Sequence, residues 1–197
     1  SAAESKGLLM SSFYAETDGR ERFMQAISVN GESIQGFQAA LRHKDGFSVL
    51  VETNAKYRRD ASGKITGIEG ITRDITDRVN KDQLNSQLGR IVENTIQEIY
   101  LFDSQTLNFT LVNRGARENI GYTMDELLEM KPWELKPTIS EYEFRELIAP
   151  LVSGDKKTIN FESSHKRKDG TRYPVEVLLQ YISSEVRPLF FADIQDL

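Results

Sequence analysis

Residues 71–78 read ITRDITDR and mark a change from one type of local structure to another. A run rich in β-formers precedes Asp74, and a long charged segment, VNKDQLNSQLGRIVEN, follows at 79–94. The pattern predicts a strand that ends at Asp74 and a helix that begins near Asp77. Asp74 or Thr76 can cap this helix, and Asp77 would lie where a helix favours negative charge. FFADIQDL, at 190–197, starts the same pattern again.

The chain contains two copies of one module. The copies share three features in the same order: a KDG motif (44–46 and 168–170), a VE pair (51–52 and 175–176) and a tyrosine (Tyr57 and Tyr181). After a short deletion, Asp74 also aligns with Asp193. We therefore expect a partial domain at 1–76, a connecting helix at 77–95 and a complete domain at 96–197.

Composition limits the class of protein. With 39% hydrophobic and 28% charged residues, the 197-residue chain has the composition of a globular protein of one or two domains. The absence of cysteine excludes disulfides, thiolate metal sites and cysteine nucleophiles, and is consistent with a cytoplasmic location. The net charge of −5 argues against nonspecific nucleic-acid binding. No apolar run is long enough to predict a membrane span.

The expected elements indicate an α+β fold. In the second copy, strands are predicted at 98–103 and 109–112, helices at 114–120, 124–130 and 140–152, and strands at 157–166, 173–183 and 188–194. This order predicts one antiparallel sheet with helices on one face. The first copy has only a helix at 19–28 and strands at 36–43, 47–58 and 66–74.

This order of elements resembles the PAS family of sensory domains. The matching stretches are VNRGARENIGYTMDEL (112–127), WELKP (133–137), HKRKDG (165–170) and DIQD (193–196). Many members carry a glycine after the DEL segment, where this chain has Glu129 and Met130. The resemblance implies tandem copies, a partial three-stranded one and a complete five-stranded one. It also implies that Asp74, Thr76 and Asp193 couple each domain to its outgoing helix, and that a C-terminal effector domain follows in the full-length protein.

In PAS domains a pocket, where present, lies between the sheet and the helices. Strand alternation allows Ile99, Leu101, Leu111, Phe161 and Val177 to share its wall, with Trp133 on the helical side. The polar candidates for a small-molecule ligand are Asn113, Tyr122 and Arg172. A filled core without a ligand is the alternative.

The sequence identifies no cofactor, and it argues against haem and against a flavin that forms a cysteinyl photoadduct. The long helix at 140–152 has no histidine to act as a haem ligand, and the cysteine of a flavin photoadduct is missing. We expect His43 and His165 to be solvated strand residues. Glu162 and Glu176 are expected to be exposed charges on neighbouring strands, because nothing completes an acid–base site around them.

Two surfaces predict self-association. Leu84, Leu88, Ile91 and Thr95 form a narrow apolar stripe on the connecting helix, which either forms a dimer seam or packs on the chain's own sheet. The partial copy lacks an opening hairpin, so either residues 1–18 fold back or a second chain covers its sheet. We expect a non-enzymatic sensory module that forms a homodimer, or alternatively a structural dimerisation spacer.

Overall fold

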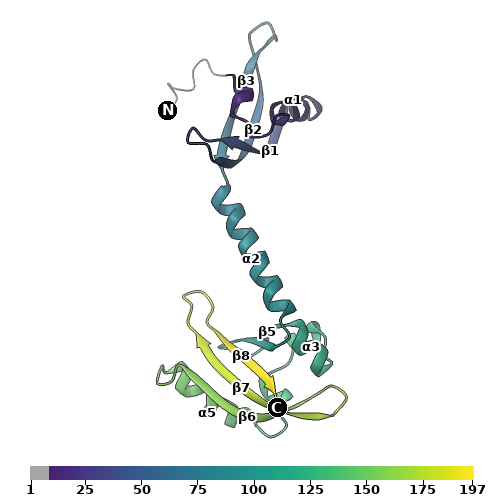
Figure 1. Ribbon diagram of the computed structural model, residues 1–197, viewed down its shortest axis with the longest axis vertical. Coiled ribbons are helices and arrows are strands. Elements are labelled where there is room, and N and C mark those ends of the chain that lie inside the picture. Colours follow the sequence, from purple (N-terminus) through teal and green to yellow (C-terminus); the bar gives the residue numbers. More distant parts are fainter. Residues whose placement is uncertain (1–8) are drawn as a thin grey trace. The chain divides into compact units, whose positions relative to one another are not determined.

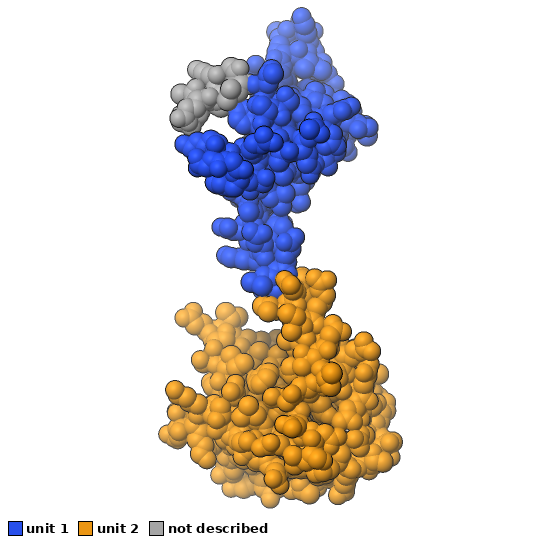
Figure 2. All heavy atoms as spheres, viewed as in Figure 1, with its two compact units in different colours: residues 1–85 blue, residues 86–197 orange. Residues whose placement is uncertain are grey.

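The computed structural model describes residues 9–197. The chain divides into two compact units, residues 1–85 and 86–197, which are distinguished by colour in Figure 2. Helix α2, Thr76–Asn94, contains the boundary between them. It lies within one residue, at each end, of the helix predicted for 77–95.

Unit 1 is a three-stranded antiparallel sheet with one helix. Its strands are β1 (Ser33–Arg42), β2 (Ser48–Arg59) and β3 (Ile65–Asp74), and their order in the sheet is the order in the sequence. The helix α1 (Gly19–Val29) packs against this sheet (Figure 1). Phe23 and Ile27 of α1 are buried with Ile34 and Ala55 of the sheet. The predicted partial copy is therefore confirmed.

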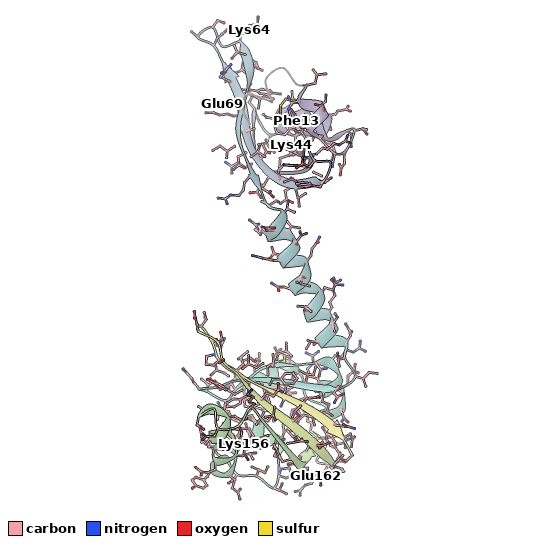
Figure 3. The ribbon with its side chains drawn as sticks, turned by 60° about the vertical axis from the view of Figure 1, so that its left-hand side comes forward. Phe13, Lys44, Lys64, Glu69, Lys156 and Glu162 are labelled. Carbon is pink, nitrogen blue, oxygen red and sulfur yellow. The ribbon has the colours of Figure 1, made fainter. Side chains whose placement is uncertain are left out.

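The segment before α1 folds back along one edge of this sheet. A 3-10 turn, η1 (Met10–Phe13), is followed by a bridge between Tyr14 and Leu41, and the Ala15 amide donates to the Ala40 carbonyl at 2.8 Å. The fold-back predicted for residues 1–18 thus occurs along β1 for its described part, and residues 1–8 lie outside the described residues. Within 9–197, no strand pairs with the other edge, β3. Figure 3 shows Lys64 at the tip of the β2–β3 hairpin and Glu69 on β3.

Unit 2 has the complete set of elements. They are β4 (Glu98–Asp103), β5 (Phe109–Val112), α3 (Arg114–Ile120), α4 (Met124–Leu128), η2 (Pro132–Leu135), α5 (Glu141–Val152), β6 (Thr158–Lys166), β7 (Arg172–Ile182) and β8 (Leu189–Asp196). All pairings are antiparallel, in the order β5-β4-β8-β7-β6. The predicted α+β, five-stranded fold is confirmed.

Local sequence explains where the helices of unit 2 begin and end. Thr123 and Ser140 each form a reciprocal capping box with the glutamate three residues later. Gly121, after α3, has φ 78°, a conformation that glycine adopts without steric cost. Glu129 ends α4 at φ −90°, so the glycine found in many relatives is not needed here. Pro150 lies inside α5 and does not end it.

The strand β4 faces the core with the opposite set of residues from the one predicted. Tyr100 and Phe102 are buried in the core, while Ile99 and Leu101 are only half-buried on the other side. The prediction that Ile99, Leu101 and Leu111 line the inner face is therefore wrong. A shift of one residue reverses every side chain of a strand, and both sets here are apolar enough to fit.

Candidate functional site

A small cavity lies between the sheet of unit 2 and its helices. Its volume is about 20 Å³, and aromatic side chains form much of its wall, among them Tyr100, Phe102, Phe144 and Phe161. A space of this size holds about one water molecule. Phe161 is the one predicted ligand residue that lines it.

The structure does not bring the other apolar and charged candidates to this cavity. Trp133 is half-buried on η2, and its ring centre lies 5.9 Å from that of Phe144. The Arg145 guanidinium lies 5.7 Å from the centre of the Trp133 ring. Tyr122 is half-buried beneath the Lys168 ammonium group. Arg172 is exposed at the start of β7.

Asn113 is fully buried, and its hydrogen bonds are all made within the protein. Its side-chain oxygen accepts from the Ile99 amide at 2.9 Å and from the Ala116 amide at 3.2 Å, so it caps α3. Its amide nitrogen donates to the carbonyls of Val92, Thr95 and Gln97 at 2.9–3.2 Å. Asn113, predicted as a polar ligand candidate, therefore ties the end of α2 to the starts of β4 and α3.

The position of His165 overturns a prediction. Its side chain is 2% exposed rather than solvated, because it lies on the same face of β6 as Ile159 and Phe161. The Lys136 ammonium nitrogen lies 2.5 Å from His165 Nε2, and Lys136 is 5% exposed. Burial lowers the pKa of Lys136 to about 7, with partial compensation from the negative charge of Glu98. Burial also holds the pKa of His165 well below its usual value, and the charge of Lys136 adds to this.

A chain of hydrogen bonds continues from His165 to a buried carboxylate. The Tyr173 hydroxyl lies 3.4 Å from His165 Nδ1 and donates to Glu98, with both carboxylate oxygens at 3.1 Å. Tyr100 and Asn119 also donate to Glu98, at 2.8 and 2.5 Å. Burial raises the pKa of Glu98, although these donors oppose the shift. The pKa values of Tyr100 and Tyr173 are raised chiefly by burial and then by the Glu98 charge.

The strand-to-helix junction of unit 1 is built from Asp74 and Thr76. Asp74 accepts a hydrogen bond from the Thr76 amide at 2.9 Å, which satisfies the first free amide of α2 and lowers the pKa of the Asp74 carboxyl. The Thr76 hydroxyl accepts from the Leu50 amide at 2.9 Å instead of capping the helix. The helix is thereby fixed to β2 at its first residue.

The register of unit 2 places Asp196 where Asp74 lies in unit 1. Asp74 is opposite Val51, and Asp196 is opposite Val175, the residue that aligns with Val51. Asp193 instead lies opposite Leu178 and Ile99, three residues before the end of β8. The alignment of Asp193 with Asp74 is therefore corrected to Asp196. The coupling role predicted for Asp193 stays a prediction.

The family model of the PAS domain matches residues 1–77 and 97–196, which together form most of the chain. The chain belongs to the PAS domain family. The partial and complete PAS sheets agree with this match, and the PAS region itself is a non-catalytic sensory domain. No curated protein is similar enough to the chain to count as a match.

Solved PAS structures share the fold. The PAS domain of an HTR-like protein from Haloarcula marismortui is 24% identical, covers 61% of this chain and 98% of its own, and gives a TM-score of 0.54. A PAS domain from Colwellia psychrerythraea is 17% identical over 58% of this chain and 97% of its own, with a TM-score of 0.51. An RNA-binding light-oxygen-voltage receptor is 10% identical over 92% of this chain and 83% of its own, with a TM-score of 0.50. At these identities the likeness shows the fold alone.

The PAS core therefore contains a polar chain that sequence reasoning missed. The signal was present in β6, where a period of two places His165 on the face of Ile159 and Phe161. Lys136 lies within the WELKP motif, which indicates the family and carries no sign that its lysine is buried. Among residues 9–197, no helix has both the length and the apolar character needed to cross a bilayer.

Proposed function

We propose that this PAS chain is a sensory and signal-relaying module, in which a change in the core of unit 2 alters the helices that enter and leave its sheet. The observation that carries the proposal is the repeated junction. The Ile75 amide donates to the Leu50 carbonyl at 2.9 Å, and the Leu197 amide donates to the Pro174 carbonyl at 3.2 Å. Both last strands therefore end against the preceding strand in the same way.

The repeated junction gives the relay a physical form. In unit 1, α2 begins two residues after the end of β3, and Asp74, the last residue of β3, accepts a hydrogen bond from the first amide of α2. In unit 2 Asp196 would play the same part for a helix that begins after Leu197. We propose that this helix leads to an output domain of the kind that PAS domains regulate, and that the module acts in the cytoplasm as a homodimer.

Exposed apolar residues on α2 support the homodimer. Leu84, Leu88 and Ile91 are each more than half exposed, and no residue of α2 is buried. An apolar stripe at this spacing is typical of the seam of a two-stranded coiled coil. Packing of the stripe on the chain's own sheet, the other possibility, receives no support from this exposure. Thr95 follows the end of α2 and donates its hydroxyl to the Ile91 carbonyl.

A second function, a dimerisation spacer without a ligand, is favoured by the small cavity. With about 20 Å³ of free space, the core is nearly filled. A spacer would transmit the geometry of the dimer and ignore the state of the core. A relay would respond to the core as well.

A chimera separates the two functions. The chain is fused through a continuous helix after Leu197 to the catalytic core of a histidine kinase, and autophosphorylation is measured. For a relay, Phe161→Leu in the cavity wall changes the activity several-fold, while the exposed Phe47→Leu does not. Activity that responds to Leu88→Asp on α2 but not to Phe161→Leu would establish the spacer and refute the relay.

A further inference from the structure

Two basic side chains face each other inside the core of unit 2. Lys136, which directly follows η2, and His165, on β6, are both almost fully buried, and their nitrogens Nζ and Nε2 are 2.5 Å apart. Among the ion pairs of residues 9–197, none involves Lys136. Lys136 also lies 5.8 Å from the centre of the Phe161 ring. A buried ammonium without a directly bonded carboxylate is costly.

Two adjacent buried cations repel each other strongly, so the pair cannot carry two positive charges near neutral pH. It therefore has two accessible states: neutral, or with one added proton. When Lys136 donates to His165 Nε2, the imidazole remains neutral with its hydrogen on Nδ1. In this tautomer Nδ1 donates to the Tyr173 hydroxyl, whose oxygen lies 3.4 Å from Nδ1. The hydrogen bonds then run in one direction, from Lys136 to Glu98.

We propose that Lys136 and His165 together form a proton-binding site, and that gain or loss of this proton is passed through Tyr173 to Glu98 at the start of β4. The proposal rests on the sensory function proposed above and names the input as a proton. The cavity supports this choice, because about 20 Å³ holds one water and no larger ligand. A proton needs no additional space.

The charged and titratable groups around the pair are consistent with a single titrating proton. Glu98 and Tyr100 face it from β4, Tyr173 faces it from β7, and the Arg167 guanidinium lies 4.0 Å from the Tyr173 ring. Asp196, at the end of β8, raises the pKa of Glu98 by repulsion. From η2 and α5 only apolar side chains, such as Leu135 and Phe144, reach the cavity. The pKa of Lys136, lowered by burial to about 7, makes it the group that changes charge near neutral pH.

Glu98 is placed to transmit the change. It is the first residue of β4 and is bonded to Asn119 of α3. The preceding residues, Thr95 and Gln97, are held by Asn113. When the pair is neutral, Glu98 loses a nearby positive charge, and the hydrogen bonds that hold this junction to the core change in strength. The effect is thus expected directly beyond the C-terminal end of α2.

The test is an NMR titration of the full chain between pH 6 and 9. The chain has two histidines, so the ring signals of His165 are compared with those of His43, which is half-exposed in unit 1. We expect the His165 ring carbons and the Gln97 and Ile99 amides to shift with a common midpoint near pH 7, and one lysine Cε to titrate at that midpoint. In Lys136→Met these shifts disappear. In the control Lys157→Met, an exposed lysine before β6, they persist.

Three results would overturn the proposal. The first is a wild-type titration in which no lysine Cε has a midpoint between pH 6 and 9, as when every lysine keeps its ordinary pKa of about 10.4. This measurement needs no variant and stands if Lys136→Met fails to fold. The second is a His165 transition that survives in folded Lys136→Met. The third is a titration of the pair that leaves the Gln97 and Ile99 amides unchanged. The kinase chimera tests the relay separately, so a relay driven by another input remains distinguishable.

Discussion

Asp196 lies directly opposite Val175 in the β7–β8 ladder. In unit 1, Asp74 lies opposite Val51 in the same way, and the residue after each aspartate donates its amide to the neighbouring strand. The two PAS sheets therefore end at corresponding positions, although the loops before their last strands differ in sequence and length. The role of the aspartate at this position can be measured in unit 1, because α2 follows Asp74.

Replacing Asp74 with alanine is expected to loosen the start of α2. The Thr76 amide loses its acceptor, so the first turn of the helix loses its cap. Hydrogen exchange of the amides at 76–80 should become about fivefold faster, as is typical of a lost helix cap. Adding Thr76→Ala should increase the effect, because the hydroxyl bonded to Leu50 is lost as well.

Asp60→Ala is the matched control for this experiment. Asp60 accepts the Ser62 and Lys64 amides at the opposite end of β3, so its loss should affect the β2–β3 hairpin and leave α2 unchanged. Unaltered exchange at 76–80 in the Asp74/Thr76 double variant would exclude the cap.

Asn113→Ala is expected to destabilise unit 2 by about 1–3 kcal/mol. The substitution removes the cap of α3 and leaves buried carbonyls at the end of α2 without a donor. Urea unfolding followed by the fluorescence of Trp133, the chain's single tryptophan, reports on this unit. Asn160→Ala, on the exposed face of β6, should change the stability by less than about 0.5 kcal/mol. Equal effects of the two substitutions would contradict the structural role of Asn113.

The stability of unit 2 is expected to rise between pH 7 and 9. Lys136 has a pKa of about 7 in the folded chain and 10.5 as its ordinary value, so the unfolded chain binds more protons across this interval. The free energy of unfolding then increases with pH, by at most about 1.4 kcal/mol per pH unit. Below pH 7 both states are protonated, and the cost of burying the charge is fully present.

Lys136→Met removes this dependence. We expect the variant to be more stable than the wild type at pH 6–7, because an apolar side chain replaces a buried charge, and its urea midpoint to be nearly constant from pH 7 to 9. Trp133 fluorescence again follows the transition, and Lys157→Met should behave as the wild type does. A wild-type midpoint that falls as pH rises over this interval would show that another group dominates.

The sequence could predict every strand and α-helix of unit 2, though not the 3-10 helix η2, because caps, turns and periodicity agree with one another. It could not decide which face of β4 is buried, because Ile99 and Leu101 are as apolar as Tyr100 and Phe102. Nor could it show that Asn113 is buried, since its hydrogen bonds join residues brought together only by the fold. The pairing of Lys136 with His165 is equally a product of tertiary structure. The similar stretches DIT (74–76) and DIQ (193–195) favoured Asp193 as the counterpart of Asp74, whereas strand register shows that Asp196 is the counterpart.

The apolar stripe of α2 predicts a dimer that a single charge weakens. Leu88→Asp places a carboxylate on the stripe between Leu84 and Ile91, and sedimentation should show at least a tenfold weaker association. Gln87→Asp, one position away on the exposed surface of α2, is the control for the lower helix propensity of aspartate. A wild-type chain that is monomeric at all accessible concentrations would remove the seam from the proposal.

The sheet of unit 1 offers a second surface for association. An apolar groove of about 690 Å³ is lined by residues of η1, α1 and all three strands, including Phe13, Phe23 and Phe37. In unit 2 the strand that corresponds to β3, which is β8, is covered on its outer edge by β4. Within the described residues, β3 has no such neighbour, and Ile71 on this edge strand is 78% exposed.

Removing the fold-back segment should therefore increase self-association through unit 1. Deletion of residues 1–15 takes away η1 and the Tyr14–Leu41 bridge, so both edges of the three-stranded sheet and more of the groove are exposed. Deletion of residues 1–8 alone, which keeps both features, is the control. Both deletions are compared by sedimentation over a concentration series in the Leu88→Asp background, where the helix seam no longer contributes. We expect larger species only for the longer deletion. If that chain stays monomeric and unit 1 still unfolds cooperatively, the fold-back segment does not protect the sheet from association.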